Sequence, residues 1–325
     1  MQPTLALSSL LLVASASAKN ILLTNDDSWV STNIRATYRD LTSAGHNVVL
    51  VAPVSQRSGW GGKFDVPYSK TLQTDGEFGY VKAGAPSWGH EDNDKNIWYF
   101  NGTPASCVAF ALNYVSPKFF NNVTFDLVVA GPNEGTNMSP GFFTGSGTDG
   151  ATYNAAYRGL PAIAFSGSNG NNSFFKDSLD EDPLEPSNIY SKKVVQFVDQ
   201  LFTAQGNNPR TMPLQTLYNV NLPPVGYQSK NEACTDPEWV FTRLTGQDAA
   251  SMDLVWNETS QMPVWHSTPF AALSACNNGD CSLPSETWVI NQNNCKSSVS
   301  VGSVDYDANI QLTNEAKALL GPLLL

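Results

Sequence analysis

Two adjacent carboxylates, Asp26 and Asp27, follow the short apolar run at residues 21–23 after Thr24 and Asn25. A run of this length is typical of a buried strand in a parallel sheet, and open α/β sheets bind ligands at the carboxyl ends of such strands. Neighbouring carboxylates repel each other and are costly to desolvate unless a cation lies between them. The pair therefore predicts a divalent-metal site in which both residues are ligands.

Two more loops that follow predicted strands carry oxygen donors. Ser58 and Gly59 end the loop after the apolar run at 47–52, and Asn133 lies in the loop after the run at 125–130. Parallel strands bring such loops to one edge of the sheet. The Asp pair, a hydroxyl and an amide carbonyl form a hard-oxygen set that suits Mg²⁺ or Mn²⁺, so one of these cations is the expected cofactor.

A segment of small residues, 144–148, opens a predicted helix and completes the set. Backbone N–H groups at a helix N-terminus bind phosphate, so Ser146, Gly147 and Thr148 are expected to cradle a phosphate group. Metal and cradle together predict hydrolysis of a phosphate ester by a metal-bound water, with the two Asp residues as the catalytic residues. Each loop alone is an ordinary turn, and it is their joint occurrence at one rim that supports this prediction.

The elements that position these loops alternate between strand and helix. Apolar runs at 20–24 and 47–52 frame a helical pattern at 31–44, which predicts a βαβ unit with a right-handed crossover. Further helices are expected at 105–114, 148–158, 191–204 and 314–320, and further strands at 125–130, 160–165 and 214–221. The predicted fold class is α/β, a Rossmann-like, mostly parallel sheet flanked by helices, with hairpins and loops at 59–100 and an irregular, disulfide-bearing C-terminal appendage.

The first 18 residues are typical of a secretion signal, with an apolar stretch and small residues before Lys19. We therefore expect a secreted protein with three parts: a signal peptide at 1–18, a catalytic domain at 19–225 and a C-terminal extension at 226–325, packed on or exchanged with the core. Sequons agree with a glycoprotein and begin at Asn101, Asn122, Asn137, Asn171 and Asn257. The net charge of −11 and pI near 4.6 disfavour polymeric nucleic acid and anionic membranes as partners, and leave a small phosphorylated metabolite.

Four of the five cysteines lie in the last third of the chain: Cys234, Cys276, Cys281 and Cys295. In an oxidising compartment we expect two disulfides among them, with all three pairings open, and a buried free thiol at Cys107. No Cys-x-x-Cys or Cys/His ligand spacing occurs, which argues against a zinc site.

Several segments carry a family resemblance: ILLTNDD at 21–27, VVLVAPVSQRSG at 48–59, GTPASCV at 102–108, FDLVVAGPNEGTN at 125–137, SGT at 146–148, RGLPAIAFS at 158–166 and, more weakly, NVNLP at 219–223. They resemble the SurE (stationary-phase survival protein) family of metal-dependent phosphatases and nucleotidases, in a secreted acid phosphatase-like branch. The resemblance implies metal ligation by Asp26, Asp27, Ser58 and Asn133. Together with the loop positions, the resemblance gives the expected substrate-binding residues: Asn25, Gly59, Asn137, Ser146, Gly147 and Thr148.

The same resemblance implies the activity. It is that of a 5′/3′-nucleotidase, a phosphomonoesterase that acts on nucleoside monophosphates and on other small phosphate esters. It also implies a homodimer or homotetramer built by exchange of C-terminal elements. The sequence leaves open the preferred substrate, the physiological metal, the pH optimum and the oligomeric state.

Some positions depart from the family pattern. Ser28 stands where the family usually has glycine, and Trp29 after it is expected to shape the mouth of the site or stack on a base. The acidic residues at 84–100 are expected to form a solvated loop. The sequon at Asn137 coincides with the expected phosphate site, so we predict that it carries no glycan.

The sequence bears on three other functions. A serine hydrolase is disfavoured because the chain has no Gly-x-Ser-x-Gly motif. An aspartyl-phosphate enzyme commonly has its second Asp two residues after the first, whereas Asp26 and Asp27 are adjacent. The remaining alternative is a catalytically weak, secreted ligand-binding protein that keeps the fold.

Overall fold

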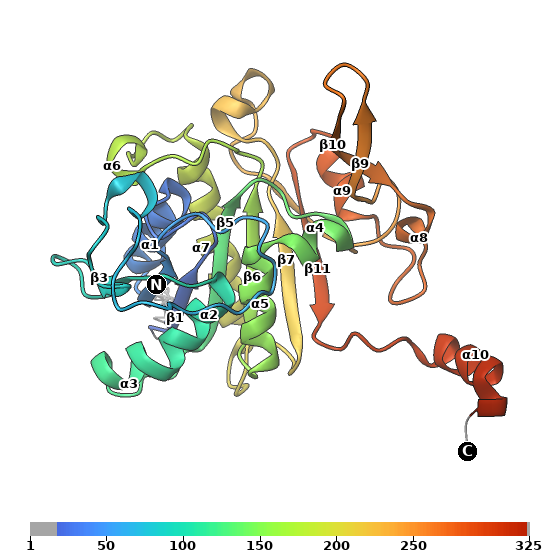
Figure 1. Ribbon diagram of the computed structural model, residues 1–325, viewed down its shortest axis with the longest axis horizontal. Coiled ribbons are helices and arrows are strands. Elements are labelled where there is room, and N and C mark those ends of the chain that lie inside the picture. Colours follow the sequence, from blue (N-terminus) through green and yellow to red (C-terminus); the bar gives the residue numbers. More distant parts are fainter. Residues whose placement is uncertain (1–17, 324–325) are drawn as a thin grey trace, which may run out of the picture.

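The computed structural model describes residues 18–323, so the expected signal peptide lies outside the described residues, apart from Ala18. Within that range, nine strands form one sheet in the order β3-β4-β2-β1-β5-β6-β7-β11-β8 (Figure 1). Their bounds are β1 Asn20–Thr24, β2 Asn47–Pro53, β3 Trp88–His90, β4 Ile97–Phe100, β5 Leu127–Glu134, β6 Ala162–Gly167, β7 Thr216–Asn221, β8 Glu238–Thr242 and β11 Lys296–Ser303.

The centre of the sheet, from β4 to β7, is entirely parallel, as the sequence predicts. The order of the central strands reverses between β1 and β5: β1 leads to β2 on one side, and β5 leads to β6 on the other. Ligands of open α/β sheets bind at this reversal, outside the carboxyl ends of the strands. The loop of Asp26 and Asp27, after β1, and Asn133, near the end of β5, therefore lie at the favoured position.

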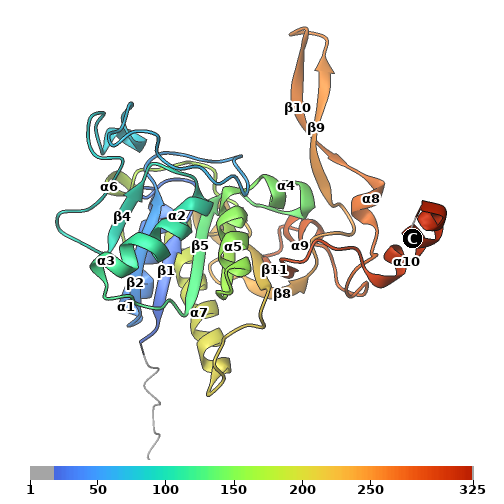
Figure 2. The same ribbon diagram turned by 60° about the horizontal axis from the view of Figure 1, so that its bottom comes forward.

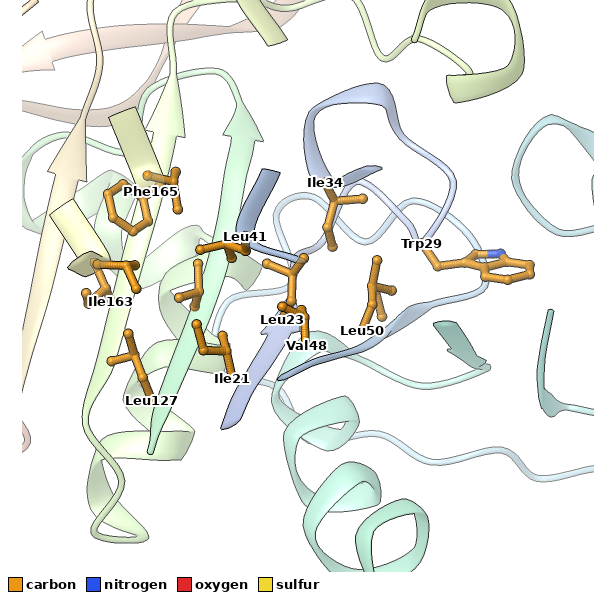
Figure 3. Close-up of a cluster of buried hydrophobic side chains, with 14 of the residues drawn as sticks. Ile21, Leu23, Trp29, Ile34, Leu41, Val48, Leu50, Leu127, Ile163 and Phe165 are labelled. Carbon is orange, nitrogen blue, oxygen red and sulfur yellow. The ribbon is translucent and has the colours of Figure 1, made fainter. Parts of the chain in front are cut away.

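Alternate residues of β1 bury against opposite layers of helices. Ile21 and Leu23 belong to the cluster that includes residues of α1 and α7, and Figure 3 shows them beside Leu50 and Leu127 of the neighbouring strands. Leu22 belongs to the other cluster, with residues of α2 and α5. A strand covered on both faces needs an unbroken apolar run, which explains the sequence at 21–23.

The helices are α1 Thr32–Ser43, α2 Pro104–Phe110, α3 Ser116–Phe119, α4 Ser139–Gly145, α5 Gly147–Tyr157, α6 Phe175–Ser178, α7 Pro186–Gln205, α8 Ala271–Ser274, α9 Glu286–Asn291 and α10 Ile310–Leu320. The helix expected at 105–114 is present: α2 continues through a π-helical turn at Ala111–Val115 into α3, so the chain stays helical to Phe119. No helix of the described chain is long and apolar enough to cross a membrane.

The acidic segment at 84–100 is more ordered than expected. Its strand β4 pairs in parallel with β2 and so extends the central sheet, and β3 pairs antiparallel with β4. Glu91 is buried in an ion pair with Arg35 of α1, and Asp94 accepts a hydrogen bond from the Tyr38 hydroxyl at 2.7 Å. The expectation of a solvated acidic loop was wrong, because these carboxylates fasten the edge of the sheet to α1.

The last hundred residues are only partly irregular. Strand β11 pairs antiparallel with β7, and β8 pairs with β11, so both continue the sheet. The hairpin of β9 (Ala250–Asn257) and β10 (Met262–Pro269) projects away from the sheet, and α10 lies apart from it at the C-terminal end (Figure 2). The sequence pattern there is weak because these two elements bury little of their own surface.

Two disulfides form among the four late cysteines, as expected. They join Cys234 to Cys295 and Cys276 to Cys281, while Cys107 is a buried free thiol. The first bond ties the loop after β7 to the start of β11, across 61 residues of chain. The second closes a turn of five residues in an exposed segment.

Removing each disulfide in turn should show how much each one contributes to the free energy of unfolding. Replacing both Cys234 and Cys295 with Ala should destabilise the protein by about 4 kcal/mol, and replacing Cys276 and Cys281 by about 2 kcal/mol, because the longer loop restricts the unfolded chain more. Equilibrium denaturant unfolding of both variants measures the difference. Equal losses would contradict a loop-length origin.

Candidate functional site

Asp26 and Asp27 lie immediately after β1 and are 2 % and 1 % exposed. Asp26 Oδ1 accepts a hydrogen bond from Thr148 Oγ1 at 2.6 Å, and its Oδ2 accepts one from the Gly147 N–H at 3.1 Å. Both donors belong to the first turn of α5. The loop after β1 and the expected phosphate cradle therefore meet as predicted, although Asp26 and Gly147 are 121 residues apart in sequence.

Asp27 is held by the other two loops. Its Oδ1 accepts a hydrogen bond from Gln56 Nε2 at 2.9 Å, and its Oδ2 accepts one from the Glu134 N–H at 2.7 Å. The Arg57 N–H also donates to the Asp26 carbonyl oxygen at 2.8 Å. All four predicted loops therefore converge on one carboxylate pair, and each carboxylate oxygen accepts one bond and keeps a free lone pair.

The pair carries charge that the protein does not neutralise. Burial raises the pKa of both carboxyl groups, and the charge of Asp26 raises that of Asp27 further. Among residues 18–323, no ion pair involves either one. The nearby Arg57 guanidinium instead donates to Ser55 and to Asn101 and lies over the Trp60 ring.

These properties fit a cation. Two buried carboxylates with free lone pairs and no cationic partner are the arrangement that a divalent ion stabilises. Asn133 lies beside them, since its Oδ1 is 3.4 Å from the Thr148 hydroxyl that donates to Asp26. The described residues hold no cluster of three or more His, Cys, Asp or Glu side chains arranged for a metal. A cation here would thus use Asp26, Asp27 and the Asn133 amide, with solvent or substrate oxygens completing its shell.

The second loop is arranged differently from the expectation. Ser58 is exposed, and its N–H donates to Gln56 Oε1 at 2.8 Å, while Gly59 is exposed beside it. It is Gln56, absent from the predicted set, whose amide reaches Asp27. Metal ligation by Ser58 and substrate contact by Gly59 stay predictions.

The cradle requires a glycine at position 147, because there is no room for a Cβ atom. A Cβ there would lie 2.8 Å from Asp26 Cβ and 2.9 Å from Asp26 Oδ2. Ser146 caps the helix, since its Oγ accepts the Asp149 N–H at 3.1 Å. Only glycine lets the first N–H of α5 approach the carboxylate this closely.

Two further predicted residues, Asn25 and Asn137, make hydrogen bonds that hold the loops of the site in place. Asn25 is fully buried and donates from Nδ2 to Ser31 Oγ at 3.3 Å. Asn137 donates from Nδ2 to Ser166 Oγ at 2.9 Å and from its N–H to Asn221 Oδ1 at 2.8 Å. Contact of either residue with a substrate stays a prediction.

Glu134 is a second residue that the sequence analysis missed. Burial raises the pKa of its carboxyl group to about 7, and its charge raises the pKa of Asp27. Its position directly after Asn133 could have indicated that it belongs to the site. It was missed because the predicted strand ended at residue 130, which left Glu134 in a loop. In the structure β5 continues to Glu134 after a register shift against β6.

The expectation for Trp29 was wrong. Its side chain is 2 % exposed and packs against Tyr80 and Tyr99, so it cannot stack on a base. Ser28 has a φ of 85°, in the left-handed region that favours glycine. Ser28 therefore adopts the turn conformation that favours glycine, although the family's usual glycine is replaced by serine here. This turn directs Trp29 into the core.

Comparisons with known proteins show the family and the fold. The family model described as "Survival protein SurE" matches residues 21–251. An "Acid phosphatase" of Yarrowia lipolytica is 46 % identical over 303 residues, which cover 93 % of this chain and 84 % of that protein. A "5'-nucleotidase SurE" of Synechocystis is 31 % identical over 206 residues, 63 % of this chain and 62 % of the relative. The crystal structure of a SurE protein from Aquifex aeolicus shares the fold, with a TM-score of 0.60, 22 % identity and coverage of 92 % and 99 %.

Replacing Gly147 with Ala tests the cradle without removing a charge. The added methyl must displace Asp26, so we expect a stability loss of about 1–3 kcal/mol and a smaller gain in Tm on addition of Mg²⁺ or Mn²⁺. Thermal denaturation with and without each cation measures both. Gly170→Ala is the matched control, since a Cβ there meets nothing within 4 Å. A Gly147→Ala variant with the cation response of the control would refute the packing argument.

Proposed function

The chain belongs to the SurE family and is a phosphoric monoester hydrolase, and we propose that it is a secreted enzyme that requires a divalent cation. Its substrates on this proposal are nucleoside monophosphates, with other small phosphate esters also accepted. The names of its relatives, acid phosphatase and 5'-nucleotidase, support both classes. The single observation that carries the cation requirement is the buried Asp26–Asp27 pair without a cationic partner in the described chain.

The cation, when bound, supplies positive charge to the phosphoryl oxygens and lowers the pKa of a bound water. The chain's own groups orient the reaction. Hydrogen bonds from α5 fix Asp26, and those from Gln56 and Glu134 fix Asp27, so neither carboxylate has to reorganise. Burial raises the pKa of both carboxyl groups in the absence of a cation, and a cation bound between them would favour their ionised forms.

The N-terminus of α5 is the expected phosphate site. This helix has 11 residues, and its first backbone N–H groups are positioned at the carboxylate pair. Such groups and the helix dipole favour an anion. This helix end and the carboxylate pair would therefore hold the phosphate and the cation at one site.

Secretion and glycosylation are part of the proposal. Asn122 and Asn171 are exposed and Asn257 is half-buried, so these sequons are the accessible acceptors. Asn137 is buried, and its Nδ2 already donates to Ser166. We expect glycopeptide mapping of secreted protein to find Asn137 unmodified. Occupancy of Asn137 in active enzyme would contradict its place in the site.

We also propose a homodimer or homotetramer. The β9–β10 hairpin exposes Leu254, Trp256, Met262 and Trp265, and α10 exposes Ile310 and Leu319. Apolar side chains gathered on projecting elements are typical of surfaces that another chain covers. Light scattering coupled to size exclusion measures the assembly.

Phosphate release is the test of the proposed function. Purified protein is assayed on p-nitrophenyl phosphate and a panel of nucleoside monophosphates, with EDTA and then with added Mg²⁺ or Mn²⁺. We expect EDTA to abolish release and one of the cations to restore it. No release from folded, cation-loaded protein would favour the ligand-binding alternative.

Asp27→Asn removes the charge and keeps the shape, so hydrolysis should fall by about 100-fold or more while the fold survives. Asp92→Asn is the control, because Asp92 is an exposed carboxylate of the β3–β4 segment. Activity in Asp27→Asn equal to that of the control would show that the hydrolysis belongs to another site or to a contaminant.

The same variant has a pH-dependent effect on stability. Because burial raises the pKa of Asp27 in the folded protein well above its usual range, the stabilising protonated form is lost as the pH rises through the folded pKa. Without metal, Asp27→Asn should therefore gain more Tm over the wild type near pH 7 than near pH 4. Thermal melts in EDTA at the two pH values check the sign, and added cation should favour the wild type.

A further inference from the structure

A cavity of about 350 Å³ lies beside the candidate site, between α4 and the C-terminal region. Thr136, Met138 and Phe142 line it from the chain segment that leads to the cradle. From the C-terminal region it is lined by Asp248, just before β9, and by Trp265 of β10. A cavity of this volume is in the range of small-molecule sites. The proposed cation and phosphate sites do not use it.

Both ends of the lining segment connect the cavity to the site. Thr136 follows Asn133 by three residues, so their Cα atoms are at most about 11 Å apart. At the other end, the Phe142 carbonyl oxygen accepts the Ser146 N–H at 2.9 Å, one residue before Gly147. A phosphate ester whose phosphate lies at the start of α5 therefore has this cavity within reach of its leaving group.

The wall from the C-terminal region is held closely against α4. A Cβ at Gly141 would overlap Ser251 Oγ of β9. A Cβ at Gly145 would lie 3.0 Å from Met252 Cε. Figure 2 shows the base of the hairpin beside α4. The two glycines let β9 approach the helix backbone, so the packing of the fold itself forms the cavity.

Two aromatic rings give the cavity its chemistry. Phe142 and Trp265 meet edge to face, with their ring centroids 6.1 Å apart, and Met138 adds a flexible apolar side chain. Trp265 is 64 % exposed, so much of its indole is free to contact a ligand. Aromatic side chains stack on planar rings, and every nucleobase has a face for such stacking. The cavity therefore suits a nucleobase better than an aliphatic group.

The charge at the cavity favours the same occupant. Asp248 is the one charged side chain among the described residues that line it, and it is exposed. Its negative charge repels the further phosphates of a polyphosphate. Its carboxylate oxygens can instead accept hydrogen bonds from the amino group of a base. A base is thus preferred to a second phosphate as the group that follows the scissile bond.

A second cavity borders the site on the side of α1 and α7, but its lining does not suit a base. It measures about 370 Å³ and includes Asn33, whose Nδ2 donates to the Pro132 carbonyl oxygen at 3.3 Å. Three carboxylates line it, those of Asp177, Asp180 and Glu185, and the described residues around it include no aromatic side chain. A planar leaving group therefore fits the cavity at α4 better.

We infer that the cavity between α4 and the β9–β10 hairpin is the leaving-group subsite, and that it holds the nucleobase of a nucleoside monophosphate against Phe142 and Trp265. This inference rests on the proposed function for the phosphate end of the substrate. It makes Trp265, which lies outside the segment matched by the family model, a residue that favours nucleotides over aliphatic phosphate esters and polyphosphate.

Variants of Trp265 separate base recognition from folding, because this side chain is largely exposed. Trp265→Ala removes the stacking surface, whereas Trp265→Phe keeps an aromatic ring. Trp256→Ala is the matched control, since Trp256 is an exposed indole of the same hairpin that does not line the cavity. It also controls for effects that act through the hairpin as a whole.

Two measurements test the subsite. Saturation-transfer NMR with adenosine in EDTA reports contact with the base and requires neither cation nor hydrolysis. Steady-state kinetics with the activating cation compare AMP with glycerol phosphate, which carries a phosphate ester but no ring. A residue with a purely structural role would change KM for both substrates alike.

We expect saturation transfer to the base protons of adenosine in the wild type, Trp265→Phe and Trp256→Ala, and its loss in Trp265→Ala. Trp265→Ala should raise KM for AMP by about tenfold and change KM for glycerol phosphate by less than about twofold. Adenosine binding that Trp265→Ala leaves unchanged, no binding to the wild type, or equal KM increases for both substrates would each overturn the inference.

The binding measurement keeps this inference separate from the proposed function. If the wild type releases no phosphate but Trp265→Ala still abolishes adenosine binding, the subsite stands and the hydrolase proposal fails. If the wild type hydrolyses AMP and Trp265→Ala leaves adenosine binding intact, the hydrolase proposal stands and the subsite is refuted.

Discussion

The structure depends on the burial of two adjacent carboxylates at the end of a strand. Asp26 and Asp27 are nearly inaccessible, and the described chain gives them no cationic partner. Four hydrogen bonds orient their oxygens, but such bonds do not cancel two buried charges. The energetic cost of burying this uncompensated pair is the physical reason for proposing that the site binds a cation.

The other elements of the fold are arranged around this carboxylate pair. The reversal of strand order between β1 and β5 opens the rim where the Asp pair sits, and α5 points its N-terminus at the same place. The C-terminal strands β8 and β11 extend the sheet, and α9 packs so that Glu286 reaches the start of α4. The C-terminal region, where the sequence pattern is weakest, thus supports the loops of the site, where the pattern is strongest.

The sequence by itself determined the sheet and the rim. Continuous apolar runs such as 21–23 can only be satisfied by strands buried on both faces, and parallel strands must send their following loops to one edge. Asp26, Asp27 and Asn133 were predicted in this way, from loops that follow apolar runs, whereas Gly147 was predicted from its place at the start of a helix. Strand β4 was not found, since a four-residue run in a Gly- and Asp-rich segment has no periodicity to distinguish it.

Only the tertiary structure decided which side chains meet across long separations. Gln56 rather than Ser58 reaches Asp27, and Glu286 contacts Ser139 from 147 residues away. The orientation of Trp29 depends on the positive φ of Ser28, which a residue name does not reveal. Periodicity and loop position are local properties that a sequence records, whereas the partner of a buried polar group is set by the packing of elements that are distant in the chain.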